Sequence, residues 1–330
     1  MPDELTTVDR GAQPADAPAD ALTRYAVTAR GAFARNTERA IRADTAIFTA
    51  WCGAHALVAL PATPQTVADF IDAMRDEDQA KPRKPATIRR YVSSIAHLHR
   101  AAELPNPADS NAVKLALRRM GMEDGVAQQQ ADGITRRLAD KLLDAGGASL
   151  RDLRNRALLA VAYDTLCRRS ELVALLRRDL HHGPHGDGTV EVRRGKTDQQ
   201  GEGMTRYVAP DTMRLVLQWL DAAGVMDGQL FRSVLKGDRV GGPLDPGTVA
   251  RVFKELARTA GLSKEEVARI SAHSSRVGAT QDMAASDRIS TTAIMQAGGW
   301  TTPRMVARYT RRQAARRSGA ARLAELQNRT

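Results

Sequence analysis

The chain has 330 residues, and its 49 Lys and Arg outnumber its 38 Asp and Glu, which gives a net charge of +11 at pH 7. This length suggests two domains, and the excess of positive charge favours a polyanionic partner. No apolar run reaches the roughly 18 residues of a membrane span. The only two cysteines, Cys52 and Cys167, argue against a disulfide framework. We therefore expect a cytoplasmic protein without a signal peptide.

Residues 1–22 are rich in Ala, Asp and Pro and lack apolar periodicity, so we expect a disordered tail there. A helical domain is predicted at residues 23–120, because apolar residues recur in it at helical spacing. Three such stripes are Ile41, Thr45, Phe48 and Cys52; Val67, Phe70, Ile71 and Met74; and Ile88, Tyr91, Ile95 and Leu98.

Capping signals and a composition change set the expected boundaries. Asn36 or Thr37 is expected to cap the first of these helices, and Pro85 to open the last. Residues 121–133, rich in Gly and Gln, are the expected linker. A second, also mainly helical domain is predicted at residues 134–330.

The second domain begins with an apolar stripe that leads to Arg168 and consists of Leu158, Val161, Ala162 and Leu166. Ser170 is expected to cap the next helix and to place Glu171 in its first turn, where a carboxylate is favoured. The apolar face of that helix is expected to hold Leu172, Leu175 and Leu176.

Residues 188–208 predict a β-hairpin. Apolar and charged residues alternate around Val190, residues 195–203 are turn-like, and the chain returns as a strand near Tyr207. Lys196 therefore lies at or near the hairpin turn. Taken alone, it would be interpreted as an ordinary exposed lysine.

The last third of the chain, together with two motifs upstream of it, combines groups that suit a single phosphoryl centre, namely a hydroxyl nucleophile and several cationic donors. Negative charge spreads over the non-bridging oxygens during phosphoryl transfer, and fixed guanidiniums bind such oxygens well. Each motif alone is weak, but their joint order is improbable by chance. The motifs are Arg168-x-x-Glu171, Gly195-Lys196-Thr197, His273-x-x-Arg276, Gly298-Gly299-Trp300 and Arg308-Tyr309.

In this order and spacing the motifs resemble the phage integrase family of tyrosine recombinases, in particular its Cre-like branch. The similarity is densest in residues 162–168, 273–279 and 294–300, and it covers about residues 24–326. The resemblance implies a mainly α fold with a small β-sheet or hairpin in the C-terminal domain. It also implies that a helical core-binding domain and a catalytic domain form a C-shaped clamp on DNA.

The chemistry and the resemblance together assign the main roles. Tyr309 is the expected nucleophile, which attacks the scissile phosphate, releases a 5′-hydroxyl and leaves a 3′-phosphotyrosyl link. Arg168 and Arg276 are expected to clamp the non-bridging oxygens. Lys196 is the expected general acid for the leaving oxygen.

Three more residues are expected to complete the site. His273 donates to the phosphate or shuttles a proton, and Trp300 supplies an indole N–H where many relatives have His. Glu171 is expected to orient its cationic neighbours rather than to act as a base. Because the covalent link conserves bond energy, no cofactor is expected, and no metal is implied.

The resemblance implies a double-stranded DNA partner with inverted-repeat half-sites, bound by a homodimer on one site and by a homotetramer in synapsis. Strand exchange would pass through a Holliday junction, with no membrane and no small-molecule substrate. Ala320, Leu323 and Leu326 predict a helix at about residues 318–328, which in the family docks into a neighbouring subunit. Packing on its own domain is the alternative. A bacterial, phage or plasmid origin and association with the nucleoid are also implied.

Basic residues on the expected DNA-binding surfaces are candidates for DNA contact, although a solvated charge is the alternative for each. The first four candidates lie on helices that the resemblance places in the major groove, and the last two lie in a Gly-rich loop. Gly247 stands where the Cre-like branch has a base-reading Arg, so the half-site is expected to differ. The candidates are Arg39, Arg42, Arg89, Arg90, Lys236 and Arg239.

Other interpretations remain to be weighed. His181, His182 and His185 form a possible metal cluster, but their Gly-Pro spacing favours a solvated loop. Tyr91 and Tyr207 do not follow a Gly-Gly-Trp segment, which argues against either as the nucleophile. A type IB topoisomerase or telomere resolvase would share the chemistry. A DNA-binding regulator with vestigial residues is a third hypothesis, against which the intact motif set argues.

Overall fold

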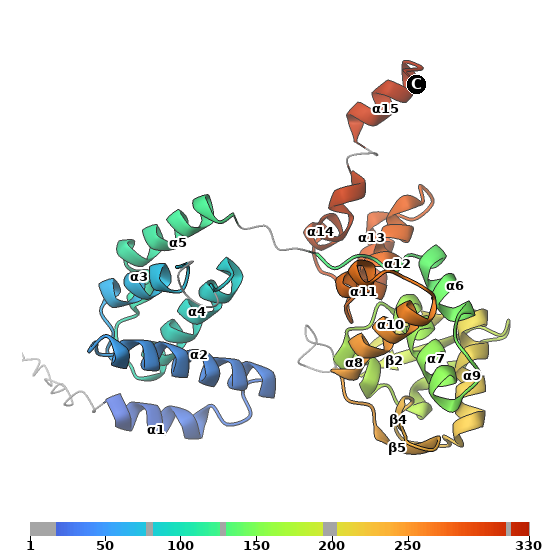
Figure 1. Ribbon diagram of the computed structural model, residues 1–330, viewed down its shortest axis with the longest axis horizontal. Coiled ribbons are helices and arrows are strands. Elements are labelled where there is room, and N and C mark those ends of the chain that lie inside the picture. Colours follow the sequence, from blue (N-terminus) through green and yellow to red (C-terminus); the bar gives the residue numbers. More distant parts are fainter. Residues whose placement is uncertain (1–17, 77–81, 126–129, 194–202, 315–317, 330) are drawn as a thin grey trace, which may run out of the picture. The chain divides into compact units, whose positions relative to one another are not determined.

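A computed structural model shows a chain that divides into two compact units, Met1–Gln129 and Gln130–Thr330 (Figure 1). The predicted mainly α fold with small antiparallel sheets is confirmed. In the part of the chain that is described, no helix has the length and apolar character to cross a membrane. The described residues are 18–76, 82–125, 130–193, 203–314 and 318–329.

The first unit buries one core between its helices. α2 packs on α4, and α3 packs on α5. Phe48 and Phe70 meet edge to face in this core, with their ring centroids 5.0 Å apart. A short 3-10 helix at Pro107–Asp109 precedes the last helix. The helices are α1 (Pro18–Thr28), α2 (Arg35–Ala54), α3 (Pro64–Ala73), α4 (Pro85–Ala101) and α5 (Asn111–Glu123).

The disordered tail was predicted at residues 1–22. That prediction was wrong for residues 18–22, which belong to α1. This helix is held on the unit by a buried Ala21 and by Tyr25, whose hydroxyl lies 3.0 Å from Nε2 of His97 on α4. Residues 1–17 lie outside the described ranges.

The linker predicted at residues 121–133 starts too early, because α5 continues to Glu123. The guanidinium of Arg75 donates to the carboxylates of Glu123 and Asp124 and so ties the end of α5 to the unit. Residues 126–129 of the predicted linker are not among the described residues.

The described part of the second unit is mainly helical, with two small antiparallel sheets. One sheet has the order β1 (Leu180–His182), β2 (Gly188–Val192), β3 (Met204–Val208), and the other pairs β4 (Arg232–Leu235) with β5 (Arg239–Pro243). A 3-10 helix at Arg177–Asp179 precedes β1. The helices are α6 (Arg136–Asp144), α7 (Leu150–Thr165), α8 (Arg169–Ala174), α9 (Pro210–Ala223), α10 (Thr248–Thr259), α11 (Lys264–Arg269), α12 (Ser274–Ala285), α13 (Thr291–Gly298), α14 (Pro303–Ala314) and α15 (Gly319–Leu326).

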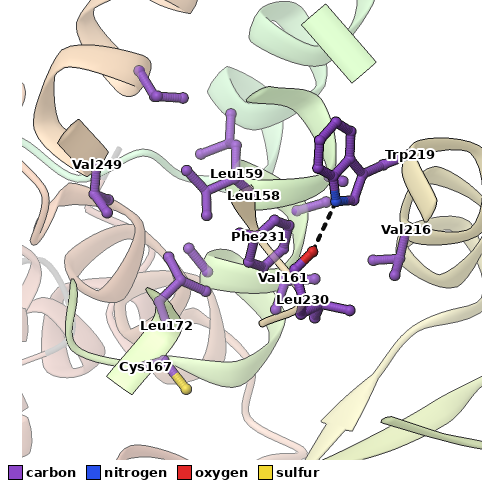
Figure 2. Close-up of a cluster of buried hydrophobic side chains, with 14 of the residues drawn as sticks. Leu158, Leu159, Val161, Cys167, Leu172, Val216, Trp219, Leu230, Phe231 and Val249 are labelled. Carbon is purple, nitrogen blue, oxygen red and sulfur yellow. Dashed lines mark hydrogen bonds between the residues drawn. The ribbon is translucent and has the colours of Figure 1, made fainter. Parts of the chain in front are cut away.

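The main core of this unit surrounds α7 (Figure 2). Three helices each contribute a fully buried side chain to it: Leu158 from α7, Trp219 from α9 and Val249 from α10. Phe231, which directly precedes β4, is also fully buried there. The indole N–H of Trp219 donates to the carbonyl of Leu230 at 2.8 Å, so the one polar atom of this large side chain is satisfied inside the core. The core therefore fixes α7, whose C-terminal end leads directly to Arg168.

The hairpin predicted at residues 188–208 is confirmed, with β2 and β3 antiparallel and Val190 opposite Arg206. The sheet has a third strand that the sequence analysis missed. His181 and His182 lie on this strand, β1, and not in a loop as predicted. The Gly and Pro residues that follow the two histidines form the turn into β2.

Candidate active site

Five of the seven predicted catalytic residues lie in or beside helix termini of the second unit. His273 precedes α12 and Arg276 lies in its first turn, while Trp300 follows the end of α13. Tyr309 lies in the middle of α14, and Arg168 and Glu171 lie at the start of α8. The seventh, Lys196, is outside the described residues.

Tyr309 is held by an imidazole at its hydroxyl and by an indole at its ring. Its Oη lies 2.5 Å from Nε2 of His273. Its ring stacks on Trp300, with centroids 5.0 Å apart and planes 25° from parallel. Both aromatic side chains are buried and belong to a small apolar cluster distinct from the main core of the unit. The hydroxyl is thus placed by two neighbours before any substrate is bound.

Arg276 is a fully buried cation that joins three segments. Its guanidinium donates to the carbonyls of Leu166 and Gly298, and it lies 4.7 Å from the centroid of the Trp300 ring. Leu166 ends α7 in the left-handed region with φ of 52°, a conformation that costs energy for a residue with a side chain. This turn presents its carbonyl to Arg276. Burial lowers the pKa of Arg276, and the positive charge of Arg168 lowers it further.

Arg168 and Glu171 form a closed pair at the start of α8. Glu171 accepts from the backbone N–H of Arg168 at 2.8 Å and from its Nη1 at 2.7 Å. This carboxylate cap starts α8 at Arg169, so the predicted cap at Ser170 was wrong. Glu171 is 6% exposed and orients the guanidinium, which remains partly accessible.

α8 also ends earlier than predicted, at Ala174. Of the three leucines assigned to its apolar face, only Leu172 is helical. Leu175 follows the helix, although it is buried in the same core.

At the start of α2 the predicted caps, Asn36 and Thr37, were likewise wrong. They lie inside that helix, which begins at Arg35 without a side-chain cap.

His273 is neutral at physiological pH. Burial is the largest cause, and the positive charges of Arg276, Arg168 and Arg308 add to it, so that the pKa of His273 falls to about 4. A neutral imidazole is able to accept a proton. Because Nε2 faces the Tyr309 hydroxyl, the imidazole is placed to accept the phenolic proton.

Two glycines permit the close approaches in this site. A Cβ at Gly278 would overlap the backbone carbonyl of Ile134, so only glycine lets α12 pack at this distance. The N–H of Ile134 donates to the carbonyl of Ser274 at the start of the same helix at 2.8 Å. Gly299 ends α13 with φ of +60°, which glycine adopts readily.

Comparisons with known proteins agree with this geometry. The model of the phage integrase family matches residues 133–316. The chain is 30% identical over 320 residues to the recombinase Cre of Escherichia phage P1, covering 91% of this chain and 92% of that protein. The chain belongs to the phage integrase family. It is therefore a site-specific tyrosine recombinase, an enzyme of DNA strand transfer.

A second relative of this recombinase is an integrase/recombinase XerD homologue of Selenomonas ruminantium, 30% identical over 287 residues, with 84% of this chain and 81% of that protein covered. Among solved structures, the Tn1549 transposon integrase in complex with transposon right end DNA matches with a TM-score of 0.60. That match covers 88% of this chain and 94% of the other at 14% identity. This likeness concerns the fold.

Arg206 of the recombinase belongs to the same region, and the sequence analysis missed it. It lies on β3, is 8% exposed and donates through Nη1 to the carbonyls of Gln296, at 2.7 Å, and Ala297. The available signal was strand register, because Arg206 and the apolar Val208 are two residues apart and share a face. An arginine on an apolar face calls for a specific partner.

The DNA-contact candidates of the first unit have different surroundings. Arg39 and Arg42 are exposed on α2, and Arg89 is exposed on α4. Arg90 donates to both oxygens of Asp44, a fully buried carboxylate, at 3.0 and 2.8 Å. Arg90 therefore serves the packing of α2 on α4, whatever else it contacts.

Lys236 and Arg239 are exposed in the second unit, and the prediction of a Gly-rich loop was wrong for Arg239 only. Lys236 lies in the turn between β4 and β5, and Arg239 begins β5. The turn closes because Gly237 adopts φ of +74°.

The remaining alternatives find little in the described residues to support them. No group of three or more His, Cys, Asp or Glu in that part of the chain is placed to hold a metal ion. His181 lies 3.7 Å from Glu191 across the sheet instead. Tyr91 is buried in the core of the first unit, and Tyr207 is 56% exposed on β3.

Proposed function

We propose that this recombinase cuts and rejoins DNA through a 3′-phosphotyrosyl intermediate on Tyr309. The observation that carries the proposal is the buried cluster in which the Tyr309 hydroxyl lies 2.5 Å from a neutral His273. In the cleavage step the phenolic oxygen bonds to phosphorus, the bond to the 5′-oxygen breaks, and His273 accepts the phenolic proton. The reverse attack by a 5′-hydroxyl rejoins a strand without a nucleotide cofactor.

The cationic groups stabilise the charge of the transition state. Arg276 and Arg168 bind the non-bridging oxygens, and the indole N–H of Trp300 donates to the same phosphate. Two buried donors of this set, Nε of Arg276 and Nε1 of Trp300, have no partner among the described residues, which suits an incoming phosphate. Lys196 protonates the leaving oxygen, and Glu171 holds Arg168 in place.

The substrate in this proposal is double-stranded DNA with inverted-repeat half-sites. The first unit contains the core-binding domain, residues 23–120, and the second unit contains the catalytic domain, residues 134–330. A homodimer binds one site, a homotetramer forms the synapse, and exchange passes through a Holliday junction. The net charge of +11 and the DNA in the Tn1549 integrase complex support a DNA partner. This substrate places the recombinase with the nucleoid of its host.

The candidates for DNA contact follow from this assignment. Arg39, Arg42 and Arg89 face the duplex from the first unit, together with the exposed side of Arg90. Lys236 and Arg239 approach the backbone from the β4–β5 turn. Selection of bound and recombined sites from a randomised DNA library identifies the target, with affinities compared at one stated salt concentration.

The test uses a suicide substrate, a selected site nicked near the cleavage point so that rejoining is prevented. The native protein is expected to form a covalent protein–DNA adduct, visible as a band resistant to denaturant. Tyr309→Phe is expected to abolish the adduct and to leave DNA affinity nearly unchanged, because only the nucleophilic oxygen is lost. Tyr207→Phe, which changes an exposed tyrosine, is the matched control and keeps the adduct.

The outcomes separate the alternatives. An adduct on the Tyr309→Phe protein would show that another residue is the nucleophile. A native protein that binds the site but never forms an adduct would be a regulator. A protein that relaxes supercoiled DNA without exchanging strands between two duplexes would be a topoisomerase.

A further inference from the structure

We propose that Arg206 is a positioning residue for strand transfer, which holds the C-terminal end of α13 and thereby sets Trp300 against Tyr309. The inference rests on the proposed function of Tyr309. It assigns to a residue of β3 a part in a site whose described catalytic residues lie on or beside helices.

The first support is the contact itself. The side chain of Arg206 leaves β3 and donates through Nη1 to two carbonyls in the last turn of α13, those of Gln296 and Ala297. The last carbonyls of a helix have no partner inside the helix and carry partial negative charge. A guanidinium supplies both the missing hydrogen-bond donor and a compensating positive charge.

Arg276 completes this arrangement from the other side. It donates to the carbonyl of Gly298, so the three successive carbonyls 296–298 are bound by two guanidiniums. The chain then turns at Gly299, and the N–H of Trp300 donates back to the carbonyl of Met295 at 2.9 Å. The backbone of Trp300 is therefore tied to the helix end that Arg206 holds.

Space around Arg206 is closed. A Cβ at Gly299 would lie 2.7 Å from Nη2 of Arg206 and 3.3 Å from the methyl carbon of Met204. The Nε atom of Arg206 is buried without a partner in the described part of the chain. A buried guanidinium with an unsatisfied N–H costs free energy, so its presence requires an explanation.

Electrostatics also connect Arg206 to the site. Burial lowers the pKa of Arg206, while the charge of Glu171 raises it and that of Arg168 lowers it. Arg206 is therefore within electrostatic reach of the pair that starts α8. A solvated arginine capping α13 would have satisfied the carbonyls without this cost.

The test separates positioning from stability by observing Trp300 directly. The chain has three tryptophans, Trp51, Trp219 and Trp300, so protein labelled with 5-fluorotryptophan gives three fluorine resonances. Trp300→Phe assigns the third. Arg206→Met removes the Nη1 donor, and Arg206→Lys keeps the charge on a single ammonium.

Arg154→Met is the matched control. Arg154 is also a buried arginine of the second unit, 5% exposed, and donates to Asn155 at 2.6 Å and to the carbonyl of Arg232 at 3.5 Å. Its loss is expected to lower Tm without moving the Trp300 resonance. The rate of adduct formation on the suicide substrate in a single turnover is measured for each variant below its Tm.

Arg206→Met is expected to shift the Trp300 resonance alone and to slow adduct formation by at least about tenfold at unchanged DNA affinity, because small misplacements of catalytic groups are costly. Arg206→Lys is expected to recover part of that rate. An unmoved Trp300 resonance with a native rate would overturn the proposal. So would an equal loss of rate in Arg154→Met at equal loss of Tm.

If Arg206→Met shows no cooperative unfolding transition, Arg206→Lys decides, and a native resonance and rate in it would overturn the proposal. The fluorine shift needs no DNA. A native protein that forms no adduct would therefore contradict the function of Tyr309, while the resonance would still test the contact with α13.

Discussion

The Tyr309 hydroxyl and the His273 imidazole pair inside the protein, where water competes little for either group. Burial is the main cost of a positive charge on His273, and three arginines raise that cost further. The same cations that suit a phosphate therefore help to keep this histidine neutral. A neutral imidazole facing a phenol is the state required of a base.

The neutral state of His273 predicts a pH dependence of stability. Its folded pKa, about 4, is depressed below the value of about 6.5 in an unfolded chain. The unfolded state thus binds the proton more readily, and the contribution is complete above about pH 6.5. It is lost as pH falls towards 4, by about 3 kcal/mol in the free energy of unfolding.

Imidazole NMR of the free protein measures this pKa, and denaturation at several pH values measures the loss of stability. His273→Gln, which cannot titrate, should lack this component when the two pH profiles are subtracted. Titration of His273 near pH 6.5 in the native protein would contradict the prediction.

Among the helices, the site is built where elements end. Leu166 follows α7 in a left-handed turn, Gly299 follows α13 in another, and His273 precedes α12. Backbone groups at such termini lack partners inside the helix, so they accept from Arg276 and Arg206. Hydrogen bonds to the carbonyls at these helix ends therefore fix the positions of the two guanidiniums.

Substitution of Gly278 tests the packing of α12. Gly278→Ala places a methyl group against the carbonyl of Ile134, a backbone atom that has little freedom to move. We expect a loss of about 1–3 kcal/mol in the free energy of unfolding, measured by chemical denaturation, and slower adduct formation because α12 carries Arg276. Gly53→Ala, in open space within α2, is expected to be neutral or slightly stabilising. Equal stability in both variants would contradict this account of the approach.

For the molecule as a whole, the two units have separate cores, and the terminal helix adds little to either. α15 has no buried residue, and Leu323 and Leu326 are 51% and 82% exposed. Exposed apolar residues on one short helix are suited to burial against another molecule. The proposed docking of α15 into a neighbouring subunit would cover them.

Removal of this helix tests the proposed assembly. A chain ending after residue 315 is expected to cleave a single site but to form tetrameric synaptic complexes at least about tenfold less, since two buried leucines are lost from each contact. Sedimentation of protein–DNA complexes measures the difference. The double variant Leu323→Ser and Leu326→Ser, in the full chain, should behave alike. Normal synapsis by either protein would contradict the docking role.

Much of the architecture follows from local patterns. The stripes at Phe48 and Ile95 are buried in α2 and α4, and the alternation around Val190 forms β2. Element ends were less predictable. Asn36 is a good cap by composition, yet α2 begins before it, and α8 starts through the carboxylate of Glu171 instead of Ser170. The first residue of a helix depends on contacts with other residues, which the periodicity of apolar residues does not reveal.

The sequence by itself determined the residue types of the site, the order of its motifs and the family, because periodicity and short motifs are local properties of the chain. Only the tertiary structure decided which atoms meet. In the folded chain the Tyr309 hydroxyl lies beside His273, and Arg90 binds the buried carboxylate of Asp44. Arg206 contacts the end of α13, although the two are 90 residues apart in sequence. Such contacts depend on how separate elements pack, and burial then sets the charge state of the groups they bring together.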